Sequence, residues 1–192
     1  MDQTTPIPFR KMNGLGNDFV VLDARRRPLA ISEAQARAIA DRKTGIGCDQ
    51  LIVLEKSGSA DVLMRIWNAE GDEVQSCGNA SRCVADLLFA EKNSEAATID
   101  TKGGWLEARK AGDKMVTIDQ GKPKFGWKDI PLSEEFADTR HIELQVGPID
   151  APHIYSPSVV NVGNPHCIFW VKDLDAVDLG KVGPMLEHHP LF

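Results

Sequence analysis

Apolar residues recur along the chain with two periods, which together predict a β-rich fold with few helices. From Asn79 to about Lys92 they return every three or four residues, the period of a helix with one buried face. A second helix is expected to begin at Ser32, which forms a capping box with Gln35, and to run to about Arg42. Short apolar runs and alternations predict strands elsewhere. The expected strands are residues 9–12, 19–22, 51–55, 62–68, 98–101, 105–109, 114–120, 141–146, 159–162 and 167–171, with a short helix at 184–188.

Glycines and prolines divide these elements. Residues 13–19 and 44–50 are glycine-rich and are expected to be loops. Residues 121–131 are rich in Gly, Pro and Lys, which is typical of a connection between domains. We therefore expect a first domain in residues 1–121, with strands around one main buried helix, and a second in residues 132–192. This arrangement predicts an α+β or α/β fold.

The composition is that of a soluble globular protein, with 42% hydrophobic and 26% charged residues among 192. The net charge of −6 argues against a nucleic-acid partner, because phosphate contacts need clustered Lys and Arg and the one basic run is residues 25–27. No apolar stretch approaches the length of a membrane span, and the polar residues 1–8 lack a signal-peptide core. We expect a cytoplasmic protein without a membrane partner.

The four cysteines are expected to be free thiols. A chain of this size has enough core residues to fold without disulfides, and no two cysteines have the C-x-x-C spacing of a zinc site, so no metal is expected. The cysteines are Cys48, Cys77, Cys83 and Cys167.

Cys77 stands directly before the longest predicted helix. Unpaired N–H groups and the positive end of the helix dipole stabilise a thiolate at such a position, and the same groups can hold a substrate carboxylate. Gly78 lets a ligand approach the backbone closely. The plainer interpretation is a buried cysteine ahead of an ordinary amphipathic helix.

Five motifs, in order along the chain from residue 9 to its end, together resemble the diaminopimelate epimerase family. No single motif would be specific. The motifs are Gly14-Leu15-Gly16-Asn17-Asp18-Phe19, Gly45-Ile46-Gly47-Cys48-Asp49-Gln50, Asn68-Ala69-Glu70-Gly71, Cys77-Gly78-Asn79-Ala80-Ser81-Arg82 and Gly163-Asn164-Pro165-His166.

This resemblance implies a diaminopimelate epimerase-like fold of two pseudo-symmetric domains. Each domain is a β-barrel-like mixed sheet wrapped around a central helix, and the active site lies in the cleft between them. The family interconverts LL- and meso-diaminopimelate, in lysine and peptidoglycan precursor biosynthesis, without a cofactor and with one cysteine from each domain. By this resemblance the chain holds one full domain and part of a second, and the full-length protein is a homodimer.

The resemblance also implies roles for particular residues. Cys77 is one of the two catalytic bases, and His166 lies beside the reacting centre and tunes the thiols. Gly78 and Asn79 offer backbone donors. The positions implied to contact the amino-acid substrate are Asn17, Gln50, Asn68, Gly78, Asn79 and Asn164.

Each of these residues has a plainer interpretation when taken alone. Asn17 and Asn164 could hold turns, Gln50 could be an exposed side chain, and an isolated His166 is more often structural. The chemistry agrees with the functional interpretation, because inverting an α-carbon requires a base on one face and an acid on the other. Charge developing on the substrate carboxylate also needs preorganised donors.

The sequence departs from the family at two places. Ala80 stands where members commonly carry glycine, a small change that the helix start should tolerate. The family's second cysteine would lie beyond residue 192, so we expect residues 1–192 alone not to epimerise at the family's rate.

Two alternatives stay open. A proline racemase shares the fold and the paired-cysteine chemistry, but Asn79 stands where racemases commonly carry histidine. A truncated, non-catalytic remnant that binds a ligand or a partner chain is the other. Exchange of the substrate α-hydrogen would distinguish a working half-site from such a remnant.

Overall fold

The computed structural model describes residues 6–192 and divides into two compact units, residues 1–121 and 122–192. Residues 122–131, expected to be a connection, belong to the second unit. Lys124 forms a backbone bridge with Asn161, and Ile130 is buried in the core of that unit. Each unit is described by itself below.

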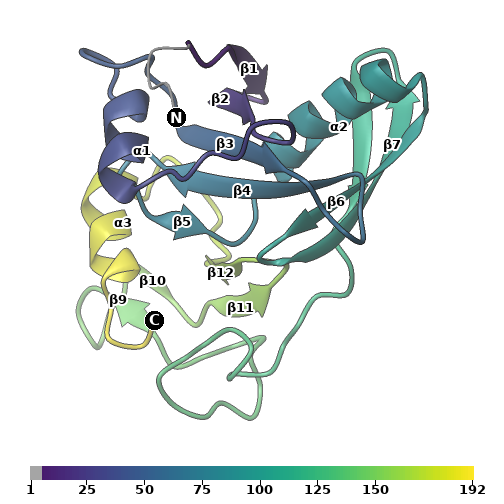
Figure 1. Cartoon of the computed structure of the whole chain (residues 1–192). Helices are drawn as coiled ribbons and strands as arrows, with labels where there is room; N and C mark the ends of the chain where they lie inside the picture. The colour runs from purple at the N-terminus through teal and green to yellow at the C-terminus, as the bar shows by residue number, and fades with distance from the viewer. Residues whose placement is uncertain (1–5) are drawn as a thin grey trace. The chain divides into compact units, whose positions relative to one another are not determined.

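The first unit is a mixed eight-stranded sheet with two helices among its described residues (Figure 1). The strand order is β1-β2-β3-β4-β6-β7-β8, with β5 paired to β4. The β2–β3 and β4–β6 pairs are parallel and the others antiparallel. The elements are β1 Phe9–Gly14, β2 Asn17–Asp23, α1 Glu33–Ala40, β3 Gln50–Glu55, β4 Val62–Asn68, β5 Glu73–Val74, α2 Gly78–Lys92, β6 Ala96–Thr101, β7 Gly104–Gly112 and β8 Met115–Asp119.

Helix α2 is the centre of the main core, which confirms the predicted sheet around a central helix. Its side chains from Ala80 to Phe89 pack with residues of β2, β3, β4, β6 and β7 in one cluster. Asn93 ends the helix in the left-handed conformation, with φ of 50°. The predicted period is therefore the buried face of α2.

The central strands β2 and β3 are buried on both faces. Their alternate residues Phe19 and Ile52 face the α2 cluster, whereas Val20 and Leu51 belong to a second cluster with α1. A strand between two helices needs apolar residues at every position. This explains the continuous apolar runs where a half-exposed strand would alternate.

The predicted loop at residues 13–19 is wrong in length. Strands β1 and β2 extend through it, and only Leu15 and Gly16 form the turn, with φ of 54° and 93°. Two successive positive φ values suit the twist of a two-residue hairpin. The turn therefore places Asn17 on the sheet, opposite Gly14.

The glycine-rich loop after α1 folds back over the end of that helix. The N–H of Gly45 donates to the Asp41 carbonyl at 3.0 Å, and those of Ile46 and Gly47 donate to the Ile39 carbonyl at 3.0 Å. These bonds occupy carbonyls that the helix end leaves unpaired. The loop then delivers Asp49 to the start of β3.

Two carboxylates tie the beginnings of β2 and β3 together. The Asp18 N–H donates to Asp49 Oδ2 and the Asp49 N–H donates to Asp18 Oδ1, both at 3.0 Å. Arg42 donates to each carboxylate at 2.7 Å, and Lys11 Nζ lies 2.7 Å from Asp18 Oδ2. The Arg42 guanidinium, with Lys11, holds the pKa of Asp18 far below its usual value.

The second unit has a small core and short strands. Its buried apolar residues include Ile142, Leu144 and Val159. Two antiparallel pairs, β9 with β10 and β11 with β12, form separate sheets. The elements are β9 Gln145–Val146, β10 Ile154–Tyr155, β11 Ser158–Asn161, β12 Pro165–Ile168 and α3 Leu179–Glu187.

Three predictions for this unit need correction. The strand expected at 141–146 is limited to β9, because the Leu144 N–H donates to the Ile142 carbonyl within its own segment. The last strand covers Pro165–Ile168, not 167–171. Helix α3 begins well before 184, because Asp178 caps it by accepting from the Lys181 N–H at 3.2 Å.

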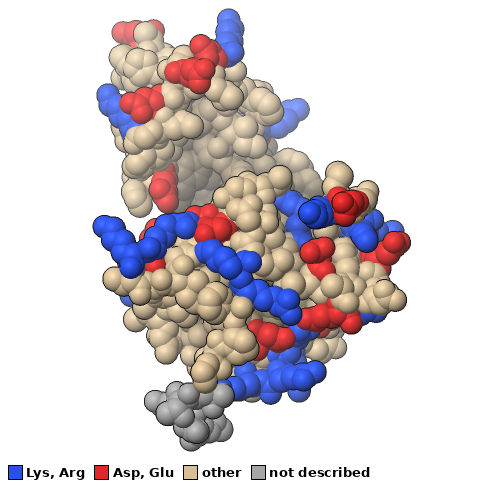
Figure 2. All heavy atoms as spheres, turned by 90° about the horizontal axis from the view of Figure 1, so that it is seen from above, with Lys and Arg blue, Asp and Glu red and all other residues tan. Residues whose placement is uncertain are grey.

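Charged side chains of both signs lie next to one another across the face shown in Figure 2. Ion pairs among the described residues include Lys92 with Asp61 and Arg25 with Glu91. Among residues 6–192, no helix has the length and apolar character needed to cross a membrane.

Gly45→Ala is expected to lower the free energy of unfolding by about 3 kcal/mol or more. The added Cβ would lie 2.0 Å from the Ala38 carbonyl oxygen and 2.8 Å from that of Ile39. Urea denaturation followed by circular dichroism measures the change. Gly58→Ala is the matched control, since no heavy atom of residues 6–192 lies within 4 Å of its added Cβ. Equal stability of the two variants would contradict the described loop packing.

Asp18→Asn is expected to destabilise the protein by about 2 kcal/mol near pH 7 by removing charge-assisted hydrogen bonds. Because the folded-state pKa is depressed, Asp18 stabilises the fold above its unfolded value of 3.8, and this stabilisation is lost as pH falls toward the folded value. The gap in stability between wild type and variant should therefore narrow below about pH 4.

Urea midpoints of both proteins at neutral and acid pH test this expectation. Asp150→Asn serves as the control, because Asp150 is exposed and forms no ion pair with any residue in the described range 6–192. A constant gap between wild type and Asp18→Asn across the pH range would refute it.

Candidate active site

Cys77 is the N-cap residue of α2, as the helical period predicts. Its backbone is extended, with φ of −149° and ψ of 109°, and its sulfur accepts from the Ala80 N–H at 3.5 Å. Its carbonyl accepts the first intrahelical bond, from the Ser81 N–H at 2.9 Å. The thiol is half-buried. The sulfur therefore lies at the end of α2 where backbone donors are in excess.

The N–H groups of Gly78 and Asn79 precede that first intrahelical bond. They are donors of the first helical turn that have no partner within the helix, and negative charge is favoured at this end of a helix. Gly78 also lies close to the end of β8, since a Cβ built there would be 3.5 Å from Gln120 Nε2. A ligand carboxylate at these donors would thus lie within reach of Cys77.

A chain of side-chain hydrogen bonds connects α2 to the sheet. Asn79 Nδ2 donates to Asn17 Oδ1 at 2.5 Å, and Asn17 Nδ2 donates to Asp49 Oδ2 at 3.3 Å. Arg82, one turn further along the helix, donates to Asn79 Oδ1. Two predicted site residues far apart in sequence, Asn17 and Asn79, are therefore in direct contact.

Gln50 and Asn68 lie opposite each other at the same end of the sheet, as partners of β3 and β4. Gln50 Oε1 is buried and accepts no hydrogen bond from any residue in the described part of the chain. A buried polar atom without a protein partner is open to a ligand or water. Asn68 Oδ1 accepts from the Asp72 N–H at 2.9 Å, so this side chain also holds the turn that follows β4.

The other three cysteines differ from Cys77 in their surroundings. Burial raises the pKa of Cys48 and of Cys83, and raises that of Cys167 to about 11. All four cysteines are free thiols, as predicted. Within residues 6–192 no group of three or more His, Cys, Asp and Glu side chains is arranged to hold a metal ion.

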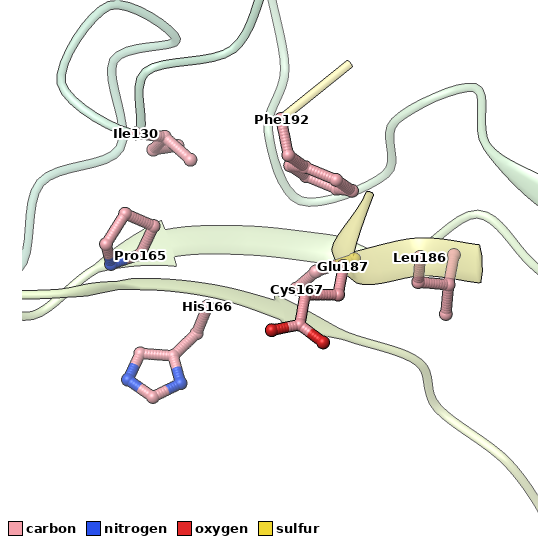
Figure 3. Close-up of a pocket in the computed structure, with 7 residues that line it drawn as sticks. All are labelled: Ile130, Pro165, His166, Cys167, Leu186, Glu187 and Phe192. Atoms are coloured by element: carbon pink, nitrogen blue, oxygen red, sulfur yellow. The ribbon is translucent and has the colours of Figure 1, made fainter. Parts of the chain in front are cut away.

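Asn164 and His166 belong to the second unit, in and after the turn between β11 and β12. His166 is exposed, and its Nε2 lies 3.2 Å from Asn164 Oδ1. It borders an apolar pocket of about 230 Å³. In Figure 3 the ring of His166 points away from Ile130 and Phe192, which line the other side of this pocket. The two predicted residues of this unit thus contact each other.

Asp49 and Arg82 flank the contact between Asn17 and Asn79, one on each side. The sequence alone indicated no role for either residue. Both stand inside motifs of the sequence. The helical spacing of three between Asn79 and Arg82 was a usable signal for one contact. Nothing local indicated that Asp49 would reach Asn17.

The chain has close relatives in sequence. A profile of the diaminopimelate epimerase family matches residues 9–126. The chain is 50% identical to a diaminopimelate epimerase of Rhodopseudomonas palustris (strain BisB18) over all of its own length and 66% of that protein. It is 51% identical to one of Afipia carboxidovorans over 96% of the chain and 64% of that protein. The chain thus spans about two thirds of the length of these relatives.

Solved structures share the fold at low sequence identity. A hydroxyproline epimerase from Agrobacterium vitis matches 95% of this chain and 54% of its own, with a TM-score of 0.58 and 15% identity. A Pseudomonas aeruginosa protein described as a predicted epimerase matches 95% of this chain and 67% of its own, with a TM-score of 0.56 and 20% identity. These two likenesses concern the fold alone.

Sequence identity near 50% distinguishes the sequence relatives from the solved structures that share only the fold. The solved structures agree with the chain in fold, whereas the sequence relatives agree with it in half of the aligned residues. The match to the family profile covers the whole sheet, both helices of the first unit and Cys77. The chain belongs to the diaminopimelate epimerase family.

Proposed function

We propose that the protein is a cofactor-independent epimerase that interconverts LL- and meso-diaminopimelate, with Cys77 as one of its two proton-transfer groups. The observation that carries the proposal is the position of Cys77, whose sulfur meets the Ala80 N–H at 3.5 Å at the start of α2. Identity near 50% to curated diaminopimelate epimerases supports the choice of substrate.

The proposed first step is removal of the substrate α-hydrogen. The Cys77 thiolate takes the proton, the C–H electron pair passes to the α-carbon, and negative charge spreads onto the adjacent carboxylate. The Ala80 N–H, which donates to this sulfur, helps to hold it at the start of α2 for this step. A second group returns a proton to the opposite face and inverts the centre.

The proposed stabilisation of the developing charge comes from backbone donors. The N–H groups of Gly78 and Asn79 are fixed by the helix before substrate arrives, so they need no reorganisation during the reaction. Such donors are most effective where the charge is greatest in the transition state. These donors would stabilise the negative charge that a pyridoxal cofactor stabilises in other racemases.

The remaining predicted residues are assigned to substrate recognition. Gln50 is a candidate because its buried oxygen accepts no hydrogen bond from the described residues. Asn17, Asn68 and Asn164 offer further amides, and we assign His166, which contacts Asn164, to the surroundings of the reacting centre. These assignments rest on the family's motifs.

We infer that Cys48, Cys83 and Cys167 are not the second proton-transfer group. Burial raises the pKa of each, which disfavours the thiolate. We further propose a place in lysine biosynthesis, in keeping with the names of its relatives. A cytoplasmic homodimer for the full-length enzyme is proposed from the family resemblance alone.

The test is deuterium exchange at the substrate α-carbon. In D₂O, residues 1–192 are expected to exchange the α-hydrogen of diaminopimelate without inverting it, because one base can remove and return a proton only on its own face. Cys77→Ala should reduce this exchange by at least about 100-fold. Mass spectrometry measures exchange, and chiral chromatography measures inversion.

Cys83→Ala is the matched control, since this buried thiol packs in the same helix but is assigned no proton transfer. It should retain most of the exchange if the chain folds, which circular dichroism checks for both variants. Undiminished exchange by Cys77→Ala would sink the assignment of Cys77. No exchange by the wild-type chain would favour a ligand-binding remnant, and exchange of L-proline instead would favour a racemase.

A further inference from the structure

Two charged side chains determine which way the amides of Asn17 and Asn79 point. Arg82 has only donors and an ionised Asp49 has only acceptors. Because Arg82 donates to Asn79 Oδ1, the Nδ2 group of Asn79 is turned toward Asn17. At the other end, Asp49 Oδ2 accepts from Asn17 Nδ2. The donor and acceptor of each hydrogen bond from Arg82 through Asn79 and Asn17 to Asp49 are thus fixed from both ends.

This direction decides what the pair can offer a ligand. Each amide oxygen already accepts a hydrogen bond, from Arg82 in one case and from Asn79 in the other. Each NH₂ group has two hydrogens and uses one of them to bond to Asn17 or Asp49. Each NH₂ group therefore keeps one hydrogen for a ligand, whereas each oxygen, which can accept two hydrogen bonds, already accepts one from a neighbouring side chain.

We propose that Arg82 and Asp49 are positioning residues that make Asn17 and Asn79 a donor pair, selective for a substrate carboxylate over an ammonium group. The inference rests on the proposed function, in that the carboxylate belongs to an amino-acid substrate. Asn79 is two residues from Cys77, so its side-chain donor supplements the backbone donors of the same helical turn.

The chain offers variants that separate this role from a general effect on the fold. Arg82→Met and Asp49→Asn each remove the fixed polarity at one end, whereas Arg82→Lys keeps a cationic donor. Asp18→Asn is the matched control for Asp49→Asn, because it also breaks an ion pair with Arg42 but leaves the bond between Asp49 and Asn17 intact.

The first readout needs no ligand. In the ¹H–¹⁵N spectrum of the 192-residue chain, one hydrogen of each carboxamide of Asn17 and Asn79 should exchange with water about tenfold more slowly than its partner. Arg82→Met and Asp49→Asn should abolish this inequality, and Arg82→Lys and Asp18→Asn should keep it. Equal exchange in the wild-type chain would overturn the inference.

The second readout is ligand preference. Heptanedioate carries two carboxylates and no ammonium, and 1,5-diaminopentane carries two ammonium groups and no carboxylate. The wild-type chain should bind heptanedioate at least about tenfold more tightly by calorimetry, and Arg82→Met and Asp49→Asn should lower that ratio about tenfold. Arg82→Lys and Asp18→Asn should keep the wild-type ratio.

The outcomes separate this inference from the proposed function. An unchanged ratio, or an equal loss of affinity for both probes, would overturn the positioning role even if Cys77-dependent α-hydrogen exchange is observed. Conversely, absence of α-hydrogen exchange with a carboxylate preference that depends on Arg82 and Asp49 would sink the epimerase and leave the donor pair standing.

Discussion

Helix α2 is buried along most of its length, and a rigid element that is buried on one side has its end fixed in space. Val84 and Leu88 are enclosed by strands of the sheet, and the first turn of α2 contacts the start of β2, where Asn79 bonds to Asn17. The position of Cys77 follows from this burial and not from the loop before it. Moving the sulfur would require withdrawing apolar side chains from the core, at about 2–5 kcal/mol for each large residue.

The sheet meets this demand by coming unusually close to the helix. A Cβ built on Gly14 would lie 3.1 Å from both the Asn79 carbonyl oxygen and the Cys83 sulfur. A larger residue there would push the β1–β2 hairpin away from the first turn of α2. The short contact between Asn17 and Asn79 is thus a product of packing, and the polar chemistry of the site depends on an apolar fit.

Much of the first unit could be predicted from the sequence, because its signals are local. The period of α2 and the capping box of Ser32 and Gln35 each lie within a few residues, and both appear as expected. The failure at residues 141–146 has the opposite cause. That segment is apolar at Ile142 and Leu144, but its backbone partners lie at residues 153–157, and the Leu144 N–H donates to the Ile142 carbonyl instead of joining that ladder.

The candidate site was likewise predictable only in part. The motifs indicated Cys77, Asn17 and Asn79 as separate positions, but the contact between the two asparagines spans 62 residues of sequence. The orientation of their amides depends on Asp49 and Arg82, whose roles appear only when the chain is folded. Sequence patterns report which residue types are present, whereas donor and acceptor direction is a property of their arrangement.

The burial of β2 and β3 on both faces has a consequence for how these strands find their alignment. Where one face of a strand is polar, a register shift by one residue would turn its apolar side chains toward water, which is unfavourable. Here both faces are apolar, so a shifted Phe19–Leu22 segment would still bury its side chains. The polar groups at the strand ends, where Asp18 and Asp49 each bond to the other's backbone N–H, therefore contribute to the register, and the ion-paired cluster beside the candidate active site also helps to align the two strands.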